Sequence, residues 1–473
     1  MTLTRRQFHA ALAGAAAPAP AQPPSSKINV LLITNDQHRA DCVGSYGNPV
    51  VRTPNLDALA AEGLVFDRHF VQCPQCVPSR SALHTGRYPH VNRTPSNLFR
   101  LPDSEQTLAH MLGREGYVTA AVGDMPFAPT KFLGGFQSVL ASVGEHAALL
   151  EKHGWRGPKV SSRRAALLRE FEALAKKQFQ AAAVPWPEEL DDTPFWAGKA
   201  IEFVRAHRGR AFFLHVNFRK PHHPFDPPAP YDRMYQDAAF PPSHTRPNEM
   251  DNKPAYQRKA LESSVGFDLR TMTPRDLDRV KSYYYGMISE NDKYIGLILE
   301  ELRSSGLDAR TLVVVTSDHG EMLGDHGLLF KGGYFYDEVL RVPLILRGPG
   351  IPKGQRVARL TEEIDVVPTV LESLGLPVPQ AVQGRSLLRE QKERPVHGEF
   401  AGTKMIRTRD WKLVHYVRAP HGELYNLRED PHELYNRYDD PAAAGQRHEM
   451  ERALIDWLVD SQDPLLAPVS AGR

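Results

Sequence analysis

Two apolar runs in the sequence are each followed at once by polar side chains that could bind a metal or an anion. Residues 28–34 and 311–316 have the length and the branched side chains of buried strands. Runs that are apolar throughout are typical of parallel sheets with both faces covered. Further apolar runs at 118–122, 211–216 and 343–346 alternate with helical patterns. The sequence therefore predicts a large α/β domain.

The pattern changes after residue 385. Short runs separated by turns follow, and a closing amphipathic helix is expected at about 448–459; the runs are 396–400, 404–407, 412–416 and 423–425. We expect an α/β domain over 27–385 and a small α+β subdomain with an antiparallel sheet over 386–473. Residues 133–189 are less regular, and we interpret them as an insertion near the rim of the functional site.

Charge and hydropathy exclude two classes of function. The 473 residues carry a net charge of +2, and Arg5 and Arg6 supply both units, so the chain without its first 21 residues is neutral. A neutral chain gives no support for nucleic-acid binding, which needs a concentrated basic face. Apolar stretches of 18 or more residues do not occur in the sequence, so we expect no membrane span.

The N-terminus has the three parts of a twin-arginine export signal. Arg5-Arg6 is followed by a mildly apolar, Ala-rich run and then by the small residues Ala19-Pro20-Ala21. We expect residues 1–21 to be removed and the protein to be exported to the periplasm. Because this route carries folded proteins, a modification made in the cytoplasm would survive transport.

The chain has only three cysteines, Cys42, Cys73 and Cys76. An odd and low count argues against a disulfide framework. Cys73 and Cys76 form a C-x-x-C, which could be a redox pair or half of a zinc site. No second pair of suitable spacing accompanies it, so the spacing supports neither interpretation well.

The most informative segment runs from Cys76 to Arg87 and reads CVPSRSALHTGR. It matches the C-x-P-S-R-x-x-L-x-T-G-R signature of the formylglycine-dependent (type I) sulfatases at every fixed position. The resemblance covers nearly the whole mature chain. It implies an alkaline-phosphatase-like fold, with a large, mixed, mostly parallel sheet between helices. It also implies that a formylglycine-generating maturation enzyme oxidises Cys76, whose hydrated aldehyde then attacks the ester.

The resemblance also implies one divalent cation. Asp36-Gln37 and Asp318-His319 follow two strands that would be neighbours in the sheet, so the four side chains can converge on the residue at position 76. Oxygen ligands favour Ca²⁺, with Mg²⁺ possible, and His319 also allows Mn²⁺.

Further resemblance assigns residues that handle the charge of the substrate. Two basic residues would hold the anion. One is Arg80, one turn after Cys76, and the other is Lys331, at the end of a segment that resembles the corresponding segment of the family. His222 lies in a Pro-His-x-Pro loop and could donate a proton to the leaving oxygen. Asn97 and Lys220 are expected near the substrate or behind the residues that contact it.

One segment departs from the family pattern. Sulfatases commonly have Gly-Lys-x-His after the strand that we place at 118–122, whereas this chain has Gly123-Asp124-Met125-Pro126. Asp124 could turn away, bind a cationic or hydroxylated part of the substrate, or mark an enzyme that is weak or tuned to another ester. Related phosphonate monoester hydrolases and phosphodiesterases also lack this Lys/His pair.

The expected reaction is therefore hydrolysis of a sulfate ester to an alcohol and inorganic sulfate by an arylsulfatase-like enzyme. The expected substrate is a sulfated small molecule or glycan, with a carbohydrate sulfate suggested by analogy. Two alternatives stay open. One is a phosphonate monoester hydrolase or phosphodiesterase that uses the same site. The other is a weakly active homologue that binds sulfated glycans.

Overall fold

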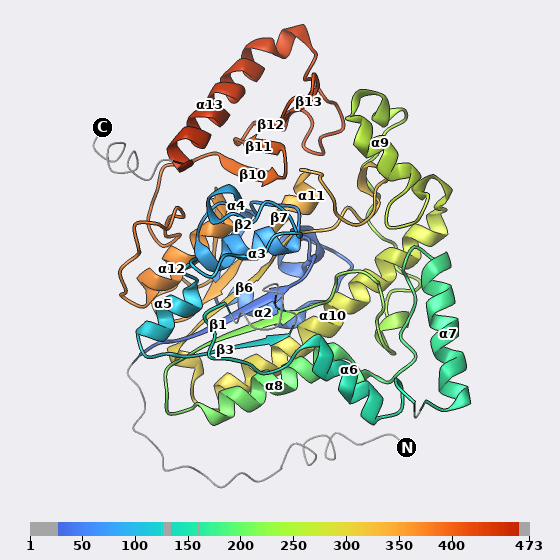
Figure 1. The fold of residues 1–473 in the computed structure, drawn as a ribbon, viewed down its shortest axis with the longest axis vertical. Coiled ribbons are helices and arrows are strands. Elements are labelled where there is room, and N and C mark those ends of the chain that lie inside the picture. Colours follow the sequence, from blue (N-terminus) through green and yellow to red (C-terminus); the bar gives the residue numbers. More distant parts are fainter. Residues whose placement is uncertain (1–26, 124, 126–133, 159, 463–473) are drawn as a thin grey trace.

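The computed structural model describes residues 27–123, 125, 134–158 and 160–462, which form a layered α/β structure with a smaller sheet beside it (Figure 1). The central sheet has the strand order β4-β3-β5-β1-β6-β8-β2-β7, and β9 also pairs with β2. Its strands are β1 (Asn29–Asn35), β2 (Leu64–Phe70), β3 (Val118–Gly123), β4 (Ser138–Val139), β5 (Phe212–Phe218), β6 (Thr311–Ser317), β7 (Arg341–Val342), β8 (Ile345–Arg347) and β9 (Gln355–Glu362).

The sheet is mixed and mostly parallel, which confirms the predicted fold class. The pairs β1/β5, β1/β6, β3/β5, β3/β4 and β2/β9 are parallel. The pairs β6/β8, β2/β8 and β2/β7 are antiparallel. The two apolar runs singled out in the sequence, now β1 and β6, lie side by side in the middle of the sheet.

Helices cover both faces of the sheet, which explains why its central strands are apolar throughout. Leu31 and Ile33 of β1 face the core under α2 (Pro54–Ala61), α8 (Asp192–Ala206) and α10 (Pro274–Ser304). Val30 and Leu32 face the opposite core, under α3 (Cys76–Thr85), α5 (Leu108–Arg114) and α12 (Val366–Ser373). Successive side chains of a strand point to opposite faces, so each face needs its own apolar set.

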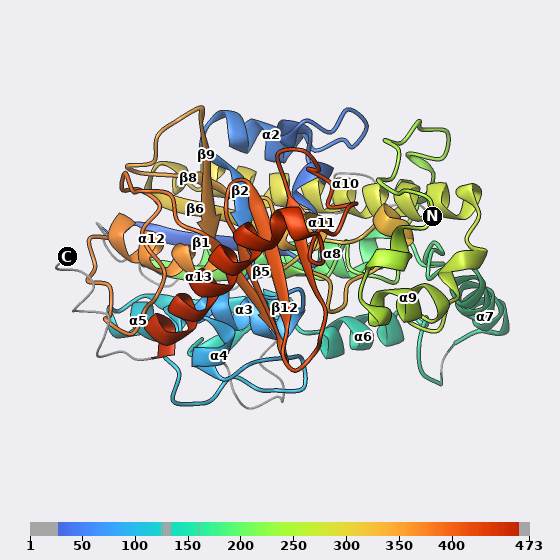
Figure 2. The ribbon, with the colours of Figure 1, turned by 90° about the horizontal axis from the view of Figure 1, so that it is seen from above.

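The C-terminal part forms the predicted antiparallel sheet. Its strands pair in chain order: β10 (Val396–Phe400), β11 (Thr403–Arg407), β12 (Trp411–Tyr416) and β13 (Gly422–Asn426). The last helix, α13 (Ala444–Gln462), crosses this sheet and buries Met450, Leu454 and Trp457 against it (Figure 2). The division at residues 385 and 386 stays a prediction.

The remaining helices are short or peripheral: α4 (Pro89–Asn92), α6 (Val143–Lys152), α7 (Ser162–Lys177), α9 (Ala255–Glu262) and α11 (Asp337–Leu340). Figure 1 places α6, α7 and α9 together at one side of the molecule. Among the described residues, no helix is long and apolar enough to cross a membrane.

Local differences from the expected elements have simple causes. Ser104 and Thr107 both precede α5, and Thr107 caps it, accepting from the backbone N–H of His110, because the buried residues of this helix begin at Leu108. Strand β2 was not expected, since Asp67 and Arg68 interrupt its apolar run. The predicted export signal, Asp124 and Pro126 lie outside the described residues.

Candidate active site

The register of two parallel strands brings the first two acidic residues together. Asn35 of β1 is the partner of Ser317 of β6, so Asp36 and Asp318 leave the sheet at the same edge. The backbone N–H of Gln37 donates to Asp318 Oδ1 at 3.0 Å and ties the two strand ends to each other. Asp36 and Asp318 are only 3% and 1% exposed. Two neighbouring carboxylates are thus held in a site with almost no solvent.

Helix α3 supplies the groups on the opposite side. Cys76 is its first residue, and Arg80 lies one turn later. The Arg80 guanidinium binds both carboxylates, with Nε at 2.7 Å from Asp318 Oδ2 and Nη2 on Asp36 Oδ2. The planar fork of arginine suits this double contact. Helix α3 ends at Gly86, whose φ of +66° favours glycine, and a Cβ there would lie 2.8 Å from Val382.

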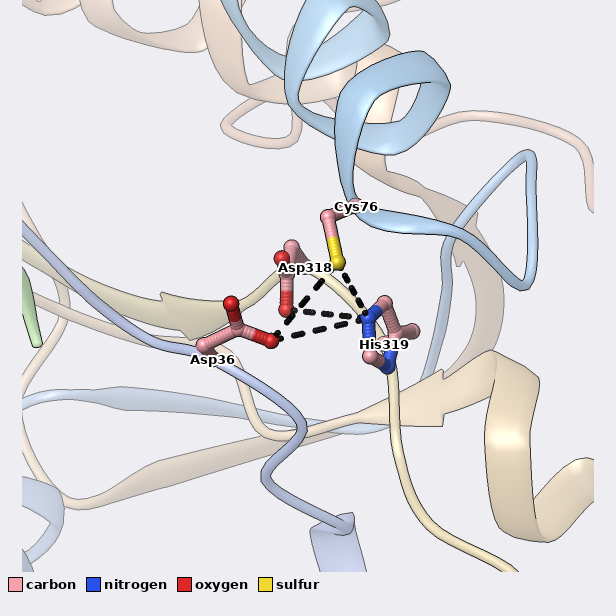
Figure 3. A group of neighbouring side chains, drawn as sticks. All are labelled: Asp36, Cys76, Asp318 and His319. Atoms are coloured by element: carbon pink, nitrogen blue, oxygen red, sulfur yellow. Dashed lines mark hydrogen bonds and ion pairs between the residues drawn. The ribbon is translucent and has the colours of Figure 1, made fainter. Parts of the chain in front are cut away.

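Cys76 Sγ lies at the centre of the cluster. It is 3.0 Å from Lys331 Nζ, 3.3 Å from His319 Nε2 and 3.9 Å from Asp36 Oδ1. Figure 3 shows the cysteine at the start of its helix, pointing toward the ends of β1 and β6. The predicted residues Cys76, Arg80, Lys331, Asp36, Asp318 and His319 therefore converge.

The donor set fits a divalent cation. One ligand atom each from Asp36, Cys76, Asp318 and His319 can be chosen so that all lie within 4.8 Å of one another. His319 Nδ1 lies 2.9 Å from the carbonyl oxygen of Gly320, so the ring donates there and Nε2 keeps its lone pair for a metal. Gln37 Oε1 is buried and has no hydrogen-bond partner. Two carboxylates, an imidazole and an amide oxygen are suitable ligands for Ca²⁺ or Mn²⁺.

Burial and neighbouring charges separate the pKa values of the two carboxyl groups. Burial raises the pKa of Asp36, and the negative charge of Asp318 raises it further. Burial acts on Asp318 in the same direction, but His319 and Arg80 outweigh it and hold the pKa of Asp318 well below its usual value. Burial, with Asp36, also raises the pKa of the Cys76 thiol to about 12. The site concentrates negative charge that a cation would stabilise.

Sequence reasoning missed Glu321. This buried carboxylate accepts from the side-chain amide of Gln37, from the backbone N–H of Leu323 at 3.1 Å and from that of Phe330. It therefore joins a predicted metal ligand to the loop that carries Lys331. The glutamate follows Asp318-His319-Gly320 directly, so its place in the chain was a signal, but its contacts depend on how the loop folds back.

His222 and His223 lie side by side, and their roles differ. The rings stack with centroids 4.1 Å apart. His223 Nδ1 lies 3.2 Å from Gln37 Nε2, whereas His222 Nδ1 donates to the backbone carbonyl of His223. Burial and the charge of Lys331 keep the pKa of His222 well below its usual value. The neutral His222 ring therefore has its lone pair on Nε2, and it delivers a proton only when an anion favours its protonation.

Asn97 and Lys220 have structural contacts. Asn97 Oδ1 accepts from the backbone N–H of Val77 at 3.0 Å and so caps the first turn of α3. The expectation that Lys220 lies near the substrate or behind the residues that contact it stays a prediction. Lys220 is 0% exposed, and its Nζ lies 2.5 Å from Asp191 and 2.8 Å from Glu290. From the sequence alone, a lysine in a Pro-rich loop is expected to be a polar surface residue. Only the fold shows that two carboxylates surround this one.

Comparisons with known proteins identify relatives of this chain. The Sulfatase family model matches residues 28–376, and a model for the C-terminal region of N-sulphoglucosamine sulphohydrolase matches 324–460. The multifunctional alkaline phosphatase superfamily protein PehA of Trinickia caryophylli is 30% identical, with 93% of this chain and 96% of that protein covered. An arylsulfatase of Clostridium perfringens is 29% identical, with 86% and 89% covered.

Solved structures show the same fold. The phosphonate monoester hydrolase of Agrobacterium radiobacter superposes with a TM-score of 0.82 at 30% identity, covering 93% of this chain and 97% of that one. A structure in complex with its substrate D-glucosamine-2-N,6-O-disulfate has a TM-score of 0.74 at 21% identity, covering 93% of this chain and 99% of that one. On its sequence, its fold and the residues that converge at Cys76, this chain belongs to the sulfatase family of sulfuric ester hydrolases in the alkaline phosphatase superfamily.

Proposed function

We propose that the enzyme hydrolyses sulfate esters through a formylglycine formed from Cys76. The observation that carries this proposal is the convergence on Cys76 Sγ of Lys331 at 3.0 Å and His319 at 3.3 Å, beside the two strand-end carboxylates. A maturation enzyme would supply the oxidation. Cys76 and Cys73 are both free thiols in the structure, so the C-x-x-C does not form a disulfide there.

The proposed chemistry has two steps. One hydroxyl of the hydrated aldehyde attacks sulfur, and the S–O bond to the alcohol breaks as the alcohol leaves. The second hydroxyl then loses its proton, and the C–O bond to sulfate breaks, which releases sulfate and restores the aldehyde. A serine could perform the first step but not the second, because it has no second hydroxyl.

Residues of this chain would bind and orient the anion. Asp36, Gln37, Asp318 and His319 would hold one divalent cation, most suitably Ca²⁺, which lowers the pKa of the nucleophilic hydroxyl. Lys331 lies against the nucleophile and would stabilise negative charge on the sulfate oxygens. Arg80 would hold Asp36 and Asp318 in place beside the anion. His222, once protonated, would pass a proton to the leaving alcohol.

Turnover and peptide mass test this proposal together. The peptide that contains residue 76 should carry formylglycine after co-expression with a maturation enzyme, and an aryl sulfate should then be hydrolysed in a metal-dependent manner. Cys76→Ala should abolish turnover, and Cys76→Ser should accumulate a sulfated peptide. An unmodified thiol, with no turnover, would favour the sulfated-glycan-binding alternative.

Hydrolysis of phosphonate monoesters or phosphodiesters is the second candidate. It is favoured by 30% identity both to the Agrobacterium phosphonate monoester hydrolase and to the multifunctional PehA protein. The sequence also has Asp124 where sulfatases commonly have a lysine. Related phosphonate monoester hydrolases also lack this lysine, although the charge of the substrate does not separate the candidates, because all three ester classes provide a singly charged tetrahedral centre. Comparing kcat/KM for an aryl sulfate, an aryl phosphonate monoester and an aryl phosphodiester decides which activity dominates.

The finer assignments belong to the same proposal. A carbohydrate sulfate remains the proposed natural substrate, by analogy. Export to the periplasm is proposed from Arg5-Arg6 and the small residues that follow. Cell fractionation of an Arg5→Lys/Arg6→Lys variant tests export. If this variant still reached the periplasm, the result would contradict the twin-arginine route.

A further inference from the structure

A cavity of about 270 Å³ away from the active site is lined by five arginines: Arg39, Arg68, Arg341, Arg407 and Arg409. Among the described residues, none of those that converge at Cys76 lines it. The central sheet supplies Arg68 from β2 and Arg341 from β7, and the antiparallel sheet supplies Arg407 at the end of β11. Like charges held around one cavity repel each other unless a counter-charge lies between them.

The surroundings of Phe70 explain why three of these arginines come together. Arg341 of β7 is the partner of Phe70 in the register of the two strands. Arg68 lies two residues before Phe70 on β2, and residues two apart share a face of a strand. The guanidinium of Arg407 lies over the Phe70 ring, 4.5 Å from its centroid. One buried aromatic side chain thus has arginines of three strands around it.

Two of the five arginines are not neutralised. The other three are held by carboxylates, in the pairs Arg39 with Asp41 and Asp325, Arg407 with Asp337, and Arg409 with Glu393. Within the part of the chain that the structure describes, Arg68 and Arg341 form no ion pair. Nη1 of Arg68 is also buried and makes no hydrogen bond. A buried, charged donor without an acceptor costs free energy, and an anion in the cavity would supply the acceptor.

Glu338 adds a second buried atom without a partner. Its side chain is 8% exposed, and Oε2 makes no hydrogen bond. Burial, together with the charge of Asp325, raises the pKa of Glu338 well above its usual value. The carboxyl group therefore holds a proton more tightly than an exposed glutamate does, and it can donate that proton to an oxyanion. The other carboxyl groups that line the cavity, Asp41 and Asp337, are bound to arginines.

We propose that this cavity binds a tetrahedral oxyanion, sulfate or phosphate, between Arg68 and Arg341. The planar fork of arginine matches the oxygens of such ions. Donors from β2, β7 and α11 approach from separate directions, which suits a tetrahedral ion better than a planar carboxylate. A water molecule takes up about 30 Å³ in the liquid, so the cavity has room for a five-atom ion and several waters. Arg341 is partly exposed, and the ion can enter from solvent.

The bound anion would fasten the C-terminal subdomain to the central sheet. Arg68 and Arg341 belong to the central sheet, whereas Arg407 and Arg409 belong to the subdomain. With an anion between them, the charges of both parts attract the same ion instead of repelling each other. The ion would therefore raise the stability of the protein without contacting the substrate.

Anion binding to the full-length protein tests the proposal. Inorganic sulfate and inorganic phosphate are titrated by calorimetry at constant ionic strength against chloride, because both ions also stabilise proteins non-specifically. Arg341→Gln and Arg68→Gln should each weaken binding by roughly 10- to 100-fold and reduce the rise in Tm. The control Arg275→Gln removes an exposed arginine in the first turn of α10 and should match the wild type. Arg68 and Arg341 are partly exposed, so folded variants are expected.

Two further comparisons separate this site from the catalytic one and the free ion from an ester. Binding that depends on Arg341 should persist in Lys331→Ala, which removes the cation beside Cys76. Inorganic phosphate that binds at least as tightly as methyl phosphate identifies the free ion as the ligand, and the reverse order identifies the ester group of a larger molecule.

Two results would overturn the proposal. One is an equal anion affinity and an equal rise in Tm in the wild type, Arg341→Gln and Arg68→Gln, which would show a general salt effect. The other is acetate that binds as tightly as sulfate and depends on Arg341 in the same way, since the cavity would then recognise carboxylates.

Discussion

The side-chain amide of Gln37 donates to the carboxylate of Glu321, and this contact leaves Gln37 Oε1 buried without a partner. An amide has one donor end and one acceptor end, so a fixed acceptor on one side decides which end faces the cation. Glu321 thus sets the orientation of a proposed metal ligand without itself belonging to the proposed ligand set.

Glu321→Gln should weaken metal binding. A glutamine side chain has one acceptor end and one donor end, so some of the N–H groups that now donate to the carboxylate would meet another donor. The Gln37 amide would then lose its fixed orientation. We expect the metal affinity to fall by about 10- to 100-fold. Metal titration of the stripped protein measures this, with Glu262→Gln on the surface of α9 as the control. An unchanged affinity would mean that Glu321 serves only the backbone of its loop.

Lys220→Met should lower stability strongly. It leaves Asp191 and Glu290 buried without their cation, which costs roughly 3–5 kcal/mol in the free energy of unfolding. Lys199→Met is the matched control. It removes an exposed pair with Glu202 and should cost about 0–1 kcal/mol. Urea unfolding measures both. Loss of turnover at unchanged stability would instead favour a substrate role for Lys220.

Asn97→Ala should remove a helix cap. Val77 N–H loses its acceptor, and we expect a cost of about 1 kcal/mol in unfolding free energy, or less because the position is exposed. Asn97→Asp keeps the acceptor and should behave like the wild type. A rise in KM with an unchanged Tm in Asn97→Ala would show that Asn97 contacts the substrate.

Stability should fall between about pH 4 and pH 7 because of Asp226. Burial raises its pKa from 3.8 to about 7, against the opposing effect of Arg219. In that window the folded state keeps a proton that the unfolded chain has lost, so the free energy of unfolding decreases as the pH rises. Asp226→Asn should flatten this dependence by roughly 2–4 kcal/mol. Urea unfolding across this pH range measures the effect, with Asp237→Asn at an exposed position as the control. An equal pH dependence of stability in the wild type and both variants would contradict the prediction.

The central strands and the residues at their ends could be predicted because strand position alone determines them. Asp36 and Asp318 follow neighbouring parallel strands, and parallel strands end at one edge. Helix α3 could be predicted from the sequence motif that it contains. The contacts of Glu321 and His223 could not be predicted in this way, because they depend on the paths of loops.

Other features depend on packing across long stretches of chain. Thr107 and Ser104 are both good caps, and only the burial of Leu108 decides between them. Lys220 meets its partners Asp191 and Glu290 from positions 29 and 70 residues away.

The burial of helix α3 sets the order of events in biosynthesis. Pro78 and Ser79 are buried in the folded chain, and Arg80 is 2% exposed and bound to two carboxylates. A maturation enzyme that reads this segment has no access to it once the sheet has formed. Under the proposed mechanism, conversion of Cys76 would therefore precede folding, and a chain that folded first would keep an inactive thiol. Slower folding would then raise the fraction of chains that carry the proposed formylglycine.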